Sequence, residues 1–441
     1  METPSWFNSS FNHSITATSS KLTFFFFAPN LAKIVSRNHH KYFQVTMYSA
    51  WYLYMVGGAL LGTVFAHPLA SQDDPPCDPE PPTCRPSWQT AEYAPSVGRL
   101  RAGLIFVDFT DSPDDHFGQE PWQLFEPLKE QPADLYRQMS FGKLDFEIVP
   151  LLDKFYRMPR DSASYGFADE EGLTTEEHKT YIGDALKAVG NDMDFDSIDL
   201  LFIAPPNGTV DINRSAAYSN PVSTESGRKF RAGSVITFGN DLYPEGNWKI
   251  VNHEAGHTMG LPDLYPYGPG GNGLWVGEFD MMGVVWGQSP DLFSWHKWRL
   301  NWIEENQVDC IMETGTTTHR LSPIEVDGGV KTVAIPVNAT GYVVAEVRSM
   351  QGIDYTACET ATGVLLYTAD SAIGSGDGPI RILDTNSATW GCGNEWNGAA
   401  LNDAPLRDVD AVFDTEFGVK VKVIAREGDD FIIEVERETS E

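Results

Sequence analysis

Apolar residues along the chain form short runs that predict an α/β arrangement from about Leu100 onward. Leu104–Val107 is an unbroken apolar run typical of a fully buried strand, and Ile198–Ile203 is a second one. Leu144–Val149 alternates apolar and polar positions, as a half-buried strand does, and Ser234–Phe238 predicts a further strand. Because segments with helical spacing separate these strands, we expect an α/β domain.

Helical spacing or helix-capping signals occur in four segments: Pro121–Met139, Thr174–Val189, Asn247–Gly260 and a segment that runs through Trp298 and Leu300. The second segment begins with a capping box, in which Thr174 and Glu177 satisfy each other's backbone N–H groups. Ser289 or Asp291 is the predicted N-cap of the last helix.

After about Gln307 the pattern changes to short strands and turns. Five segments are β-type: Thr332–Val337, Tyr342–Val347, Gly363–Tyr367, Val419–Ile424 and Phe431–Val435. A chain of 441 residues is also longer than one that usually folds around a single hydrophobic core. We therefore expect an α/β domain at residues 98–307 and a small, sandwich-like all-β domain at residues 308–441.

The clearest chemical signal is the run at residues 252–265, Asn-His-Glu-Ala-Gly-His-Thr-Met-Gly-Leu-Pro-Asp-Leu-Tyr. His253 and His257 are four residues apart, which places both imidazoles on one face of a helix. Two neutral imidazoles in this arrangement can hold Zn²⁺, and the Glu254 carboxylate can reach a water at the metal without binding the metal. The pattern predicts one catalytic zinc ion, with Glu254 as the catalytic base.

A catalytic zinc requires three protein ligands and an open fourth position. Gly260 ends the helix, Pro262 prevents it from resuming, and Asp263 follows six residues after His257. Asp263 is therefore the predicted third ligand. Glu278 lies 21 residues past His257 and is the alternative, because its spacing suits a ligand from a later segment.

The run from His253 to Tyr265 resembles the signature of the immune-inhibitor-A-like (M6) secreted zinc metalloproteases, which are relatives of the metzincins. Four other segments resemble this family: Arg101–Asp111, Tyr136–Phe146, Gly277–Gly283 and Ser294–Ile303. The resemblance covers about residues 98–308. It implies a metzincin-like protease domain in which Met282, aligned with the family's methionine turn, forms an apolar floor beneath the metal.

The motif and the resemblance together predict a zinc metalloendopeptidase that hydrolyses peptide bonds. Glu254 would take a proton from the attacking water and pass it to the leaving amine. Tyr265 or Tyr267 is a candidate to stabilise the oxyanion, although tyrosines beside loops are more often packing residues. Two alternatives stay open: a catalytically inactive secreted binding protein on a protease fold, and an aminopeptidase that acts on chain ends.

The charge of the chain narrows the set of partners. There are 62 acidic and 31 basic residues, a net charge of −31, which repels nucleic acid and anionic membranes. The sequence has no basic patch with interleaved aromatic residues. We therefore expect a monomer that acts on protein or peptide substrates, with no nucleic acid and no stable membrane association.

The N-terminal part predicts a secreted protein. Met47–Ala70 has 24 consecutive residues without Asp, Glu, Lys or Arg and is interpreted as a signal peptide, cleaved at Val64–Ala66 or Pro68–Ala70. Residues 1–46 lack periodicity and are interpreted as an unstructured extension, with Met47 favoured over Met1 as the start. The alternative is an uncleaved signal-anchor with its basic residues on the cytoplasmic side.

Residues 71–97 are rich in proline and are predicted to form a linker or a short pro-segment. Cys77 and Cys84 enclose a proline-rich loop and are expected to pair with each other. A second bridge, with one cysteine left over, is expected among the other three: Cys310, Cys358 and Cys392. Disulfide bonds would agree with secretion.

The sequence also contains glycosylation sequons and acidic turns. Glycosylation at sequons would agree with an extracellular surface, and the sequons are at Asn207, Asn213 and Asn338. Acidic turns are candidate Ca²⁺ sites, and they lie at Asp108–Asp115, Asp370–Asp377 and Asn402–Asp410. Because these turns lack EF-hand spacing, solvated loops are the preferred interpretation.

Overall fold

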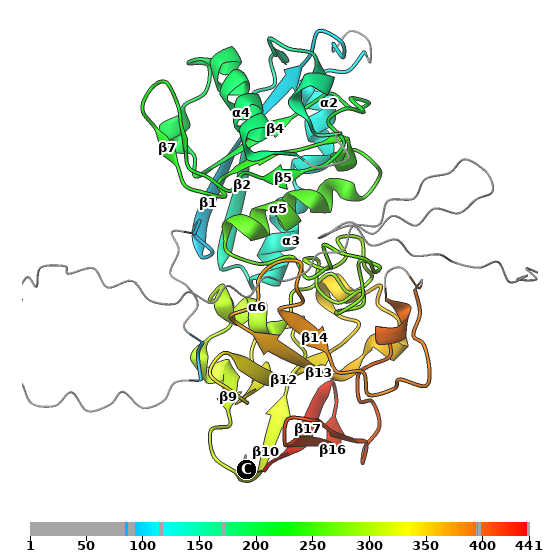
Figure 1. Ribbon diagram of the computed structural model, residues 1–441. Helices are drawn as coiled ribbons and strands as arrows, with labels where there is room; N and C mark the ends of the chain where they lie inside the picture. The colour runs from blue at the N-terminus through cyan, green and yellow to red at the C-terminus, as the bar shows by residue number, and fades with distance from the viewer. Residues whose placement is uncertain are drawn as a thin grey trace, which may run out of the picture. The chain divides into compact units, whose positions relative to one another are not determined.

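The computed structural model describes residues 84–86, 93–113, 118–168, 173–393, 395 and 398–438 (Figure 1). These residues belong to one compact unit, Cys77–Glu441. The predicted extension at 1–46 and the predicted signal peptide at 47–70 lie outside the described residues, as does most of the proline-rich segment 71–97. Within the described part, no helix has the length and apolar character needed to cross a membrane.

A six-stranded mixed sheet forms the framework of the N-terminal half. Its strands are β1 (Gly98–Asp108), β2 (Leu144–Pro150), β3 (Tyr156–Arg157), β4 (Leu200–Ala204), β5 (Ala216–Ala217) and β8 (Val235–Thr237). The order is β2-β1-β4-β8-β5, and β3 also pairs with β1. β5 pairs with β8 in an antiparallel manner, whereas the other pairs are parallel. A separate hairpin consists of β6 (Val222–Ser223) and β7 (Lys229–Phe230).

Alternation along β1 separates the two faces of this sheet. Ile105 belongs to an apolar cluster that includes α4 (Thr175–Val189). Its neighbour Leu104 belongs to a second cluster, which includes α3 (Gln131–Met139) and α5 (Ile250–Thr258). Helices therefore cover both faces of the sheet, which explains why the run predicted as a buried strand is apolar at every position.

The predicted start of α4 is confirmed, whereas the segment predicted as one helix at Pro121–Met139 is not a single helix. Thr174 caps α4 as predicted: its Oγ1 accepts a hydrogen bond from Glu177 N–H at 3.3 Å, and the Glu177 carboxylate accepts one from Thr174 N–H at 3.0 Å. The segment Pro121–Met139, however, is not one helix. It divides into α2 (Pro121–Phe125), a 3-10 turn at Glu126–Leu128 and α3. Each of the two later pieces has a proline in its first turn, and proline cannot continue a preceding helix.

The C-terminal part is built from two sheets. The first has the order β14-β13-β12-β11-β9, with β9 (Val308–Cys310), β11 (Thr332–Pro336), β12 (Gly341–Arg348), β13 (Gly363–Asp370) and β14 (Ile380–Ile382). The second has the order β10-β17-β16-β15, with β10 (Gly315–Leu321), β15 (Val412–Asp414), β16 (Val419–Glu427) and β17 (Asp430–Arg437). One apolar cluster contains residues of both sheets. All five strands predicted in this part are present, and the chain is a mixed α/β protein with several sheets and few helices.

An apolar core extends across the predicted domain boundary at residue 307. The cluster that contains Phe106 of β1 also contains Val344 of β12. Helix α6 (Ser294–Arg299) contributes Trp295 and Trp298 to the same cluster. The tryptophans of this helix therefore pack in the core between the two predicted parts.

Helix α6 is capped by the C-terminal sheet and not by its own preceding residues. Ser294 N–H donates to the Glu346 carboxylate at 2.7 Å, and Trp295 N–H donates to the Tyr367 hydroxyl at 3.3 Å. The prediction that Ser289 or Asp291 is the N-cap is wrong, because Phe293 occupies that position without a side-chain cap. Acceptors from strands β12 and β13 replace the missing cap.

Two disulfide bonds are present among the described residues, Cys84–Cys310 and Cys358–Cys392. The predicted local pair of Cys77 and Cys84 is wrong, because Cys84 is bonded to a residue 226 positions away. Cys77 itself lies outside the described residues. Arg85 reinforces the long-range link through bonds to Glu305 at 2.6 Å and to Asn301 at 2.6 Å.

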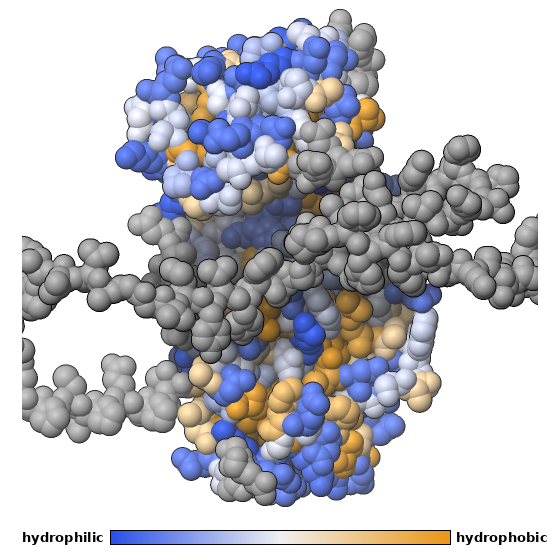
Figure 2. Space-filling view, in the orientation of Figure 1, coloured by the Kyte–Doolittle hydropathy of each residue, from blue (hydrophilic) through white to orange (hydrophobic). Residues whose placement is uncertain are grey.

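Apolar residues are interspersed with hydrophilic ones on the face that Figure 2 shows. Large exposed apolar side chains come from segments that are far apart in the sequence, and they include Trp122, Val210, Tyr267, Tyr355 and Trp390. Exposed apolar residues that occur singly are normal for soluble proteins. Among those five, Tyr267 is of particular interest because of its contacts, which are described below.

Candidate metal centre

Helix α5 presents His253 and His257 from one face, as the spacing predicts. The centroids of the two imidazole rings are 4.8 Å apart, and the rings are nearly perpendicular. His253 is buried and His257 is half-buried. A 3-10 turn at Asn247–Lys249 leads directly into α5, so the helical segment begins where the sequence predicts it.

Helix α5 ends where glycine permits a left-handed turn. Gly260 has a φ of 94°, and Leu261 N–H returns to the Gly256 carbonyl at 3.1 Å. A Cβ atom at Gly260 would come within 2.8 Å of the Tyr93 ring, so packing as well as backbone conformation requires glycine here. The turn directs the following residues back toward the two histidines.

Asp263 completes a cluster of three potential metal ligands. Its Oδ1 atom lies 3.1 Å from Nε2 of His253 and 3.2 Å from Nε2 of His257. The three ligand atoms all lie within 4.8 Å of one another, and no other His, Cys, Asp or Glu side chains in the described part of the chain form such a group. The structure therefore brings together the three residues that the sequence predicts as zinc ligands.

Backbone carbonyls fix the orientation of both imidazoles. Nδ1 of His253 lies 3.0 Å from the Met281 carbonyl oxygen, and Nδ1 of His257 lies 2.8 Å from the Leu261 carbonyl oxygen. A carbonyl oxygen can only accept, so each Nδ1 must carry the proton. In the neutral ring, Nε2 then keeps its lone pair for a metal, which is the usual arrangement of metal-binding histidines.

The turn at Asp280–Gly283 supports two parts of this cluster. The Met281 carbonyl is the acceptor for His253, and the Met282 carbonyl accepts a hydrogen bond from Leu264 N–H at 2.9 Å. Leu264 directly follows the aspartate of the cluster. One short turn thus holds a histidine on α5 and the segment that delivers the carboxylate.

Met282 and Asp280 give this turn its interior contacts. The Met282 side chain is buried beneath α5, where its Sδ atom would lie 2.9 Å from a Cβ at Gly256. The Asp280 carboxylate accepts hydrogen bonds from Met282 N–H at 2.8 Å, Phe293 N–H at 2.9 Å and His296 Nδ1–H at 2.8 Å. Sequence reasoning did not identify Asp280 as a site residue, because its role depends on partners at unrelated spacings.

The two predicted oxyanion tyrosines both lie beside the cluster. The Tyr267 hydroxyl donates to Oδ2 of Asp263 at 2.5 Å, and the Tyr265 ring stacks on His253 with centroids 6.2 Å apart. Desolvation of the hydroxyl groups, followed by the neighbouring Asp263 carboxylate, raises the pKa of both tyrosines, although much of the Tyr267 side chain is exposed. Both hydroxyls therefore stay protonated at neutral pH. In this arrangement Tyr267 orients the Asp263 carboxylate.

Without a bound metal, burial and the neighbouring charges shift the pKa values of three residues: Glu254, His257 and Asp263. Burial raises the pKa of the Glu254 carboxyl, and the two nearby imidazoles partly offset this effect. Burial alone would lower the pKa of His257, but the Asp263 carboxylate raises it to about 9. Burial would raise the pKa of Asp263, yet its contacts with both imidazoles hold that pKa well below its ordinary value. Asp263 is therefore a carboxylate at any physiological pH.

A loop of the C-terminal part also reaches the cluster. Ser375 Oγ accepts a hydrogen bond from Asp263 N–H at 2.9 Å. Gly376 N–H lies 3.4 Å from the Asp263 carbonyl oxygen, and the Gly376 carbonyl oxygen lies 3.4 Å from Tyr267 N–H. Nothing in the sequence pattern indicates this contact, because the two segments are 112 residues apart.

Glu278, the alternative third ligand, lies elsewhere. Its Oε2 atom accepts a hydrogen bond from Gln288 N–H at 3.3 Å, and its own N–H donates to Asn402 Oδ1 at 3.0 Å. These contacts place Glu278 against the segment that contains Asn402 and outside the His253–His257–Asp263 group.

Carboxylates in the described parts of the three acidic turns bond to protein groups. Asp111 accepts from Ser162 N–H at 2.7 Å, and Asp370 accepts from Ala372 N–H at 2.9 Å. Asp403 accepts from the Thr389 hydroxyl at 2.6 Å. Ca²⁺ binding by these turns stays a prediction.

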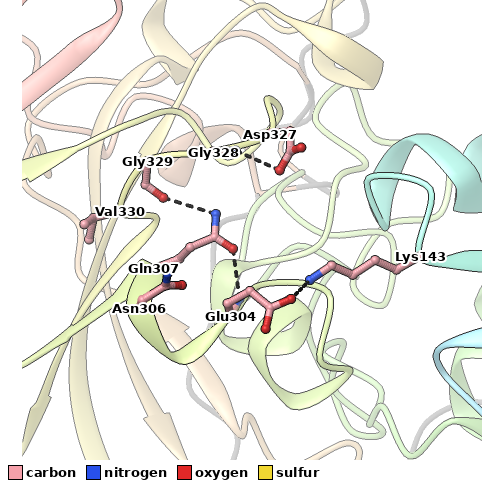
Figure 3. Close-up of a pocket in the computed structure, with 8 residues that line it drawn as sticks. All are labelled: Lys143, Glu304, Asn306, Gln307, Asp327, Gly328, Gly329 and Val330. Atoms are coloured by element: carbon pink, nitrogen blue, oxygen red, sulfur yellow. Dashed lines mark hydrogen bonds and ion pairs between the residues drawn. The ribbon is translucent and has the colours of Figure 1, made fainter.

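The pocket in Figure 3, with a volume of about 420 Å³, is separate from the His253–His257–Asp263 cluster. It is lined by Lys143, Glu304, Asn306, Gln307 and the loop Asp327–Val330. Its polar groups bond to one another: Lys143 Nζ pairs with Glu304 at 2.5 Å, and Gln307 Nε2 donates to the Gly329 carbonyl at 3.2 Å. We assign no function to this pocket.

No protein-family model matches the chain, and no curated protein is significantly similar to it.

Proposed function

We propose that this protein is a secreted zinc-dependent metalloendopeptidase with a metzincin-like catalytic domain of the M6 type. The observation that carries the proposal is the convergence of His253 Nε2, His257 Nε2 and Asp263 Oδ1 next to the buried Glu254. Two disulfide bonds agree with an oxidising, extracellular location.

The donor set fits a zinc ion on three counts. Each imidazole directs Nε2 toward Asp263 Oδ1, and because Nδ1–H is engaged by a carbonyl, the neutral ring has its lone pair on Nε2. Oδ1 of Asp263 is buried and receives no well-directed hydrogen bond, although both Nε2 atoms lie close to it. Two ligands about 2.1 Å from a tetrahedral metal lie roughly 3.4 Å apart. The distances of 3.1 and 3.2 Å from Asp263 Oδ1 to the two nitrogens are near that value.

A bound cation could take the place of the proton that keeps His257 charged beside Asp263. A buried carboxylate oxygen without a hydrogen-bond donor is costly unless positive charge faces it. Among the described residues, the Tyr267 hydroxyl donates a hydrogen bond to Oδ2 of Asp263. The other oxygen, Oδ1, faces the Nε2 atoms of the two histidines. The arrangement suits a carboxylate that binds the metal through a single oxygen.

His253, His257 and Asp263 would hold the metal, and bound zinc would polarise a substrate carbonyl and acidify a water molecule. Glu254 follows the first ligand on α5 and is buried. Its carboxylate would take the proton of the attacking water and pass it to the leaving amine nitrogen. Met281 and Leu261 would keep the two imidazoles in position through their carbonyls.

The position of β5 at the edge of the sheet favours an extended peptide as substrate. β5 is the last strand of its sheet in the described structure, it is antiparallel to β8, and it lies close to α5. An extended segment of a protein can pair with such an edge through its main chain. Because pairing of this kind does not require a free terminus, it supports internal cleavage over removal of terminal residues.

The test combines metal content with peptide cleavage. The purified protein should contain about one zinc per chain and should cleave casein and a peptide blocked at both ends, and a chelator should stop both reactions. Cleavage of free-ended peptides alone would indicate an aminopeptidase. Zinc without any cleavage would indicate a binding protein, and absence of zinc binding would overturn the proposal.

A further inference from the structure

The loop between strands β13 and β14, residues 371–379, connects the C-terminal sheet to the metal cluster. Ser375 Oγ accepts the Asp263 N–H at 2.9 Å, and Gly376 N–H approaches the Asp263 carbonyl at 3.4 Å. Both backbone polar groups of the third ligand are therefore engaged by two successive residues of this loop. Ser375 also interacts with the Tyr267 side chain, which in turn bonds to Oδ2 of Asp263.

We propose that Ser375 is a positioning residue for Asp263 and that the C-terminal sheet is, through this loop, a component of the metal site. This inference rests on the proposed function. Asp263 lies in a segment without helix or strand, so nothing in its own element fixes its backbone. The two contacts from the loop restrain the Asp263 backbone itself, beside the bond of the next residue, Leu264, to the Met282 carbonyl. The orientation of this backbone decides whether Oδ1 faces the two histidines.

The loop itself is held in place independently of the cluster. Arg381, in β14, donates to the Asp377 carbonyl at 2.9 Å and to the Gly378 carbonyl at 3.2 Å. Its guanidinium lies 5.1 Å from the centre of the Trp275 ring. The loop therefore has restraints of its own next to the residues that contact Asp263, and these restraints do not involve the cluster.

Close packing between Gly376 and Tyr267 adds a second restraint. Gly376 has a φ of 79°, and a Cβ atom there would lie 2.4 Å from the Tyr267 ring. Any larger residue would therefore displace the tyrosine that bonds to Asp263. Gly374, two residues earlier, is a control for the added Cβ alone, because a Cβ there would meet no atom within 4 Å and its φ is not in the left-handed region.

The first experiment compares Ser375→Ala with Ser371→Ala in the full secreted chain. Ser371 is exposed in the same loop, and its hydroxyl donates to the Thr340 carbonyl, away from the cluster. Zinc affinity is measured by competition with a chromophoric chelator, which requires no activity. We expect Ser375→Ala to bind zinc about tenfold more weakly, Ser371→Ala to match the wild type, and Ser375→Thr, which keeps the hydroxyl, to restore most of the affinity.

The outcomes distinguish this inference from the proposed function. If the wild type binds no zinc, the proposed function fails. If the wild type binds zinc and Ser375→Ala binds it equally well, only the role of the loop is overturned. Should Ser375→Ala fail to fold, Gly376→Ala and Gly374→Ala decide: weaker zinc binding in the first alone supports the inference, and equal binding in both overturns it.

Discussion

Asp280 accepts a hydrogen bond from Nδ1 of His296 at 2.8 Å, and both side chains are buried. The same carboxylate accepts the N–H groups of Met282 and Phe293 at 2.8 and 2.9 Å. The Asp280 backbone has a φ of 71°, a left-handed conformation that is uncommon for residues other than glycine. The pair thus joins helix α6 to the turn whose carbonyl orients His253.

Replacing Asp280 with Asn should weaken this turn. An amide has one oxygen and cannot accept the three hydrogen bonds in the same geometry, so at least one buried donor loses its partner. We expect the free energy of unfolding to fall by about 2–3 kcal/mol and zinc to bind more weakly. Urea unfolding and chelator competition measure the two effects. Asp408→Asn, at an exposed position, is the control, and equal behaviour of the two variants would contradict the assigned role.

Glu254→Gln should separate metal binding from chemistry. The amide keeps the size of the side chain but cannot take a proton, so zinc content should be unchanged while kcat on casein falls by about 10²–10⁴-fold. Glu245→Gln, an exposed position shortly before α5, should keep full activity. Activity of Glu254→Gln at the wild-type level would rule out the carboxylate as general base.

Tyr267→Phe should act on the metal more than on the transition state. Its hydroxyl bonds to Oδ2 of Asp263, so its removal frees the carboxylate that we propose as the third ligand. We expect zinc affinity to fall several-fold, up to about tenfold, while kcat at saturating zinc changes little. The opposite result, unchanged zinc affinity with a large loss of kcat, would restore the interpretation of Tyr267 as the oxyanion donor.

The local features of the fold and of the site could be predicted from the sequence. The i, i+4 histidines, the glycine turn and the Thr174–Glu177 capping box each depend on neighbours within a few positions, and each has the expected geometry. The Asp263 position follows from the turn that Gly260 starts. These signals are short-range, so periodicity and turn chemistry suffice to predict them.

The contacts between residues far apart in the sequence could not be predicted from periodicity and turn chemistry. Cys84 pairs with Cys310, and no spacing rule selects that partner among five cysteines. The acceptors that cap α6 come from Glu346 and Tyr367, which lie on strands of the C-terminal sheet. Ser375 reaches Asp263 across 112 positions. Each contact is decided by packing between elements, and the local pattern of the residues involved carries no information about it.

The buried carboxyl group of Glu325 should make the free energy of unfolding decrease as the pH rises. Its carboxylate accepts hydrogen bonds from Ser349 N–H at 3.0 Å and from the Ser349 hydroxyl at 2.9 Å, and the nearby charged groups are Asp354, Asp291 and Arg348. Burial, followed by the charge of Asp354, raises the pKa of Glu325 above its ordinary value of 4.5, and the guanidinium of Arg348 offsets this only partly. The folded chain therefore keeps the proton to a higher pH than the unfolded chain does.

Over the pH range between these two pKa values the folded state binds more protons, so the free energy of unfolding decreases as pH rises. The slope for one such group is at most about 1.4 kcal/mol per pH unit. Glu325→Gln removes the titration and should flatten the dependence between pH 5 and pH 8, with its largest gain over the wild type at the alkaline end. Urea unfolding at matched pH values measures this, with the exposed Glu416→Gln as control. Parallel curves for the wild type and Glu325→Gln would show that this carboxyl is ionised in both states.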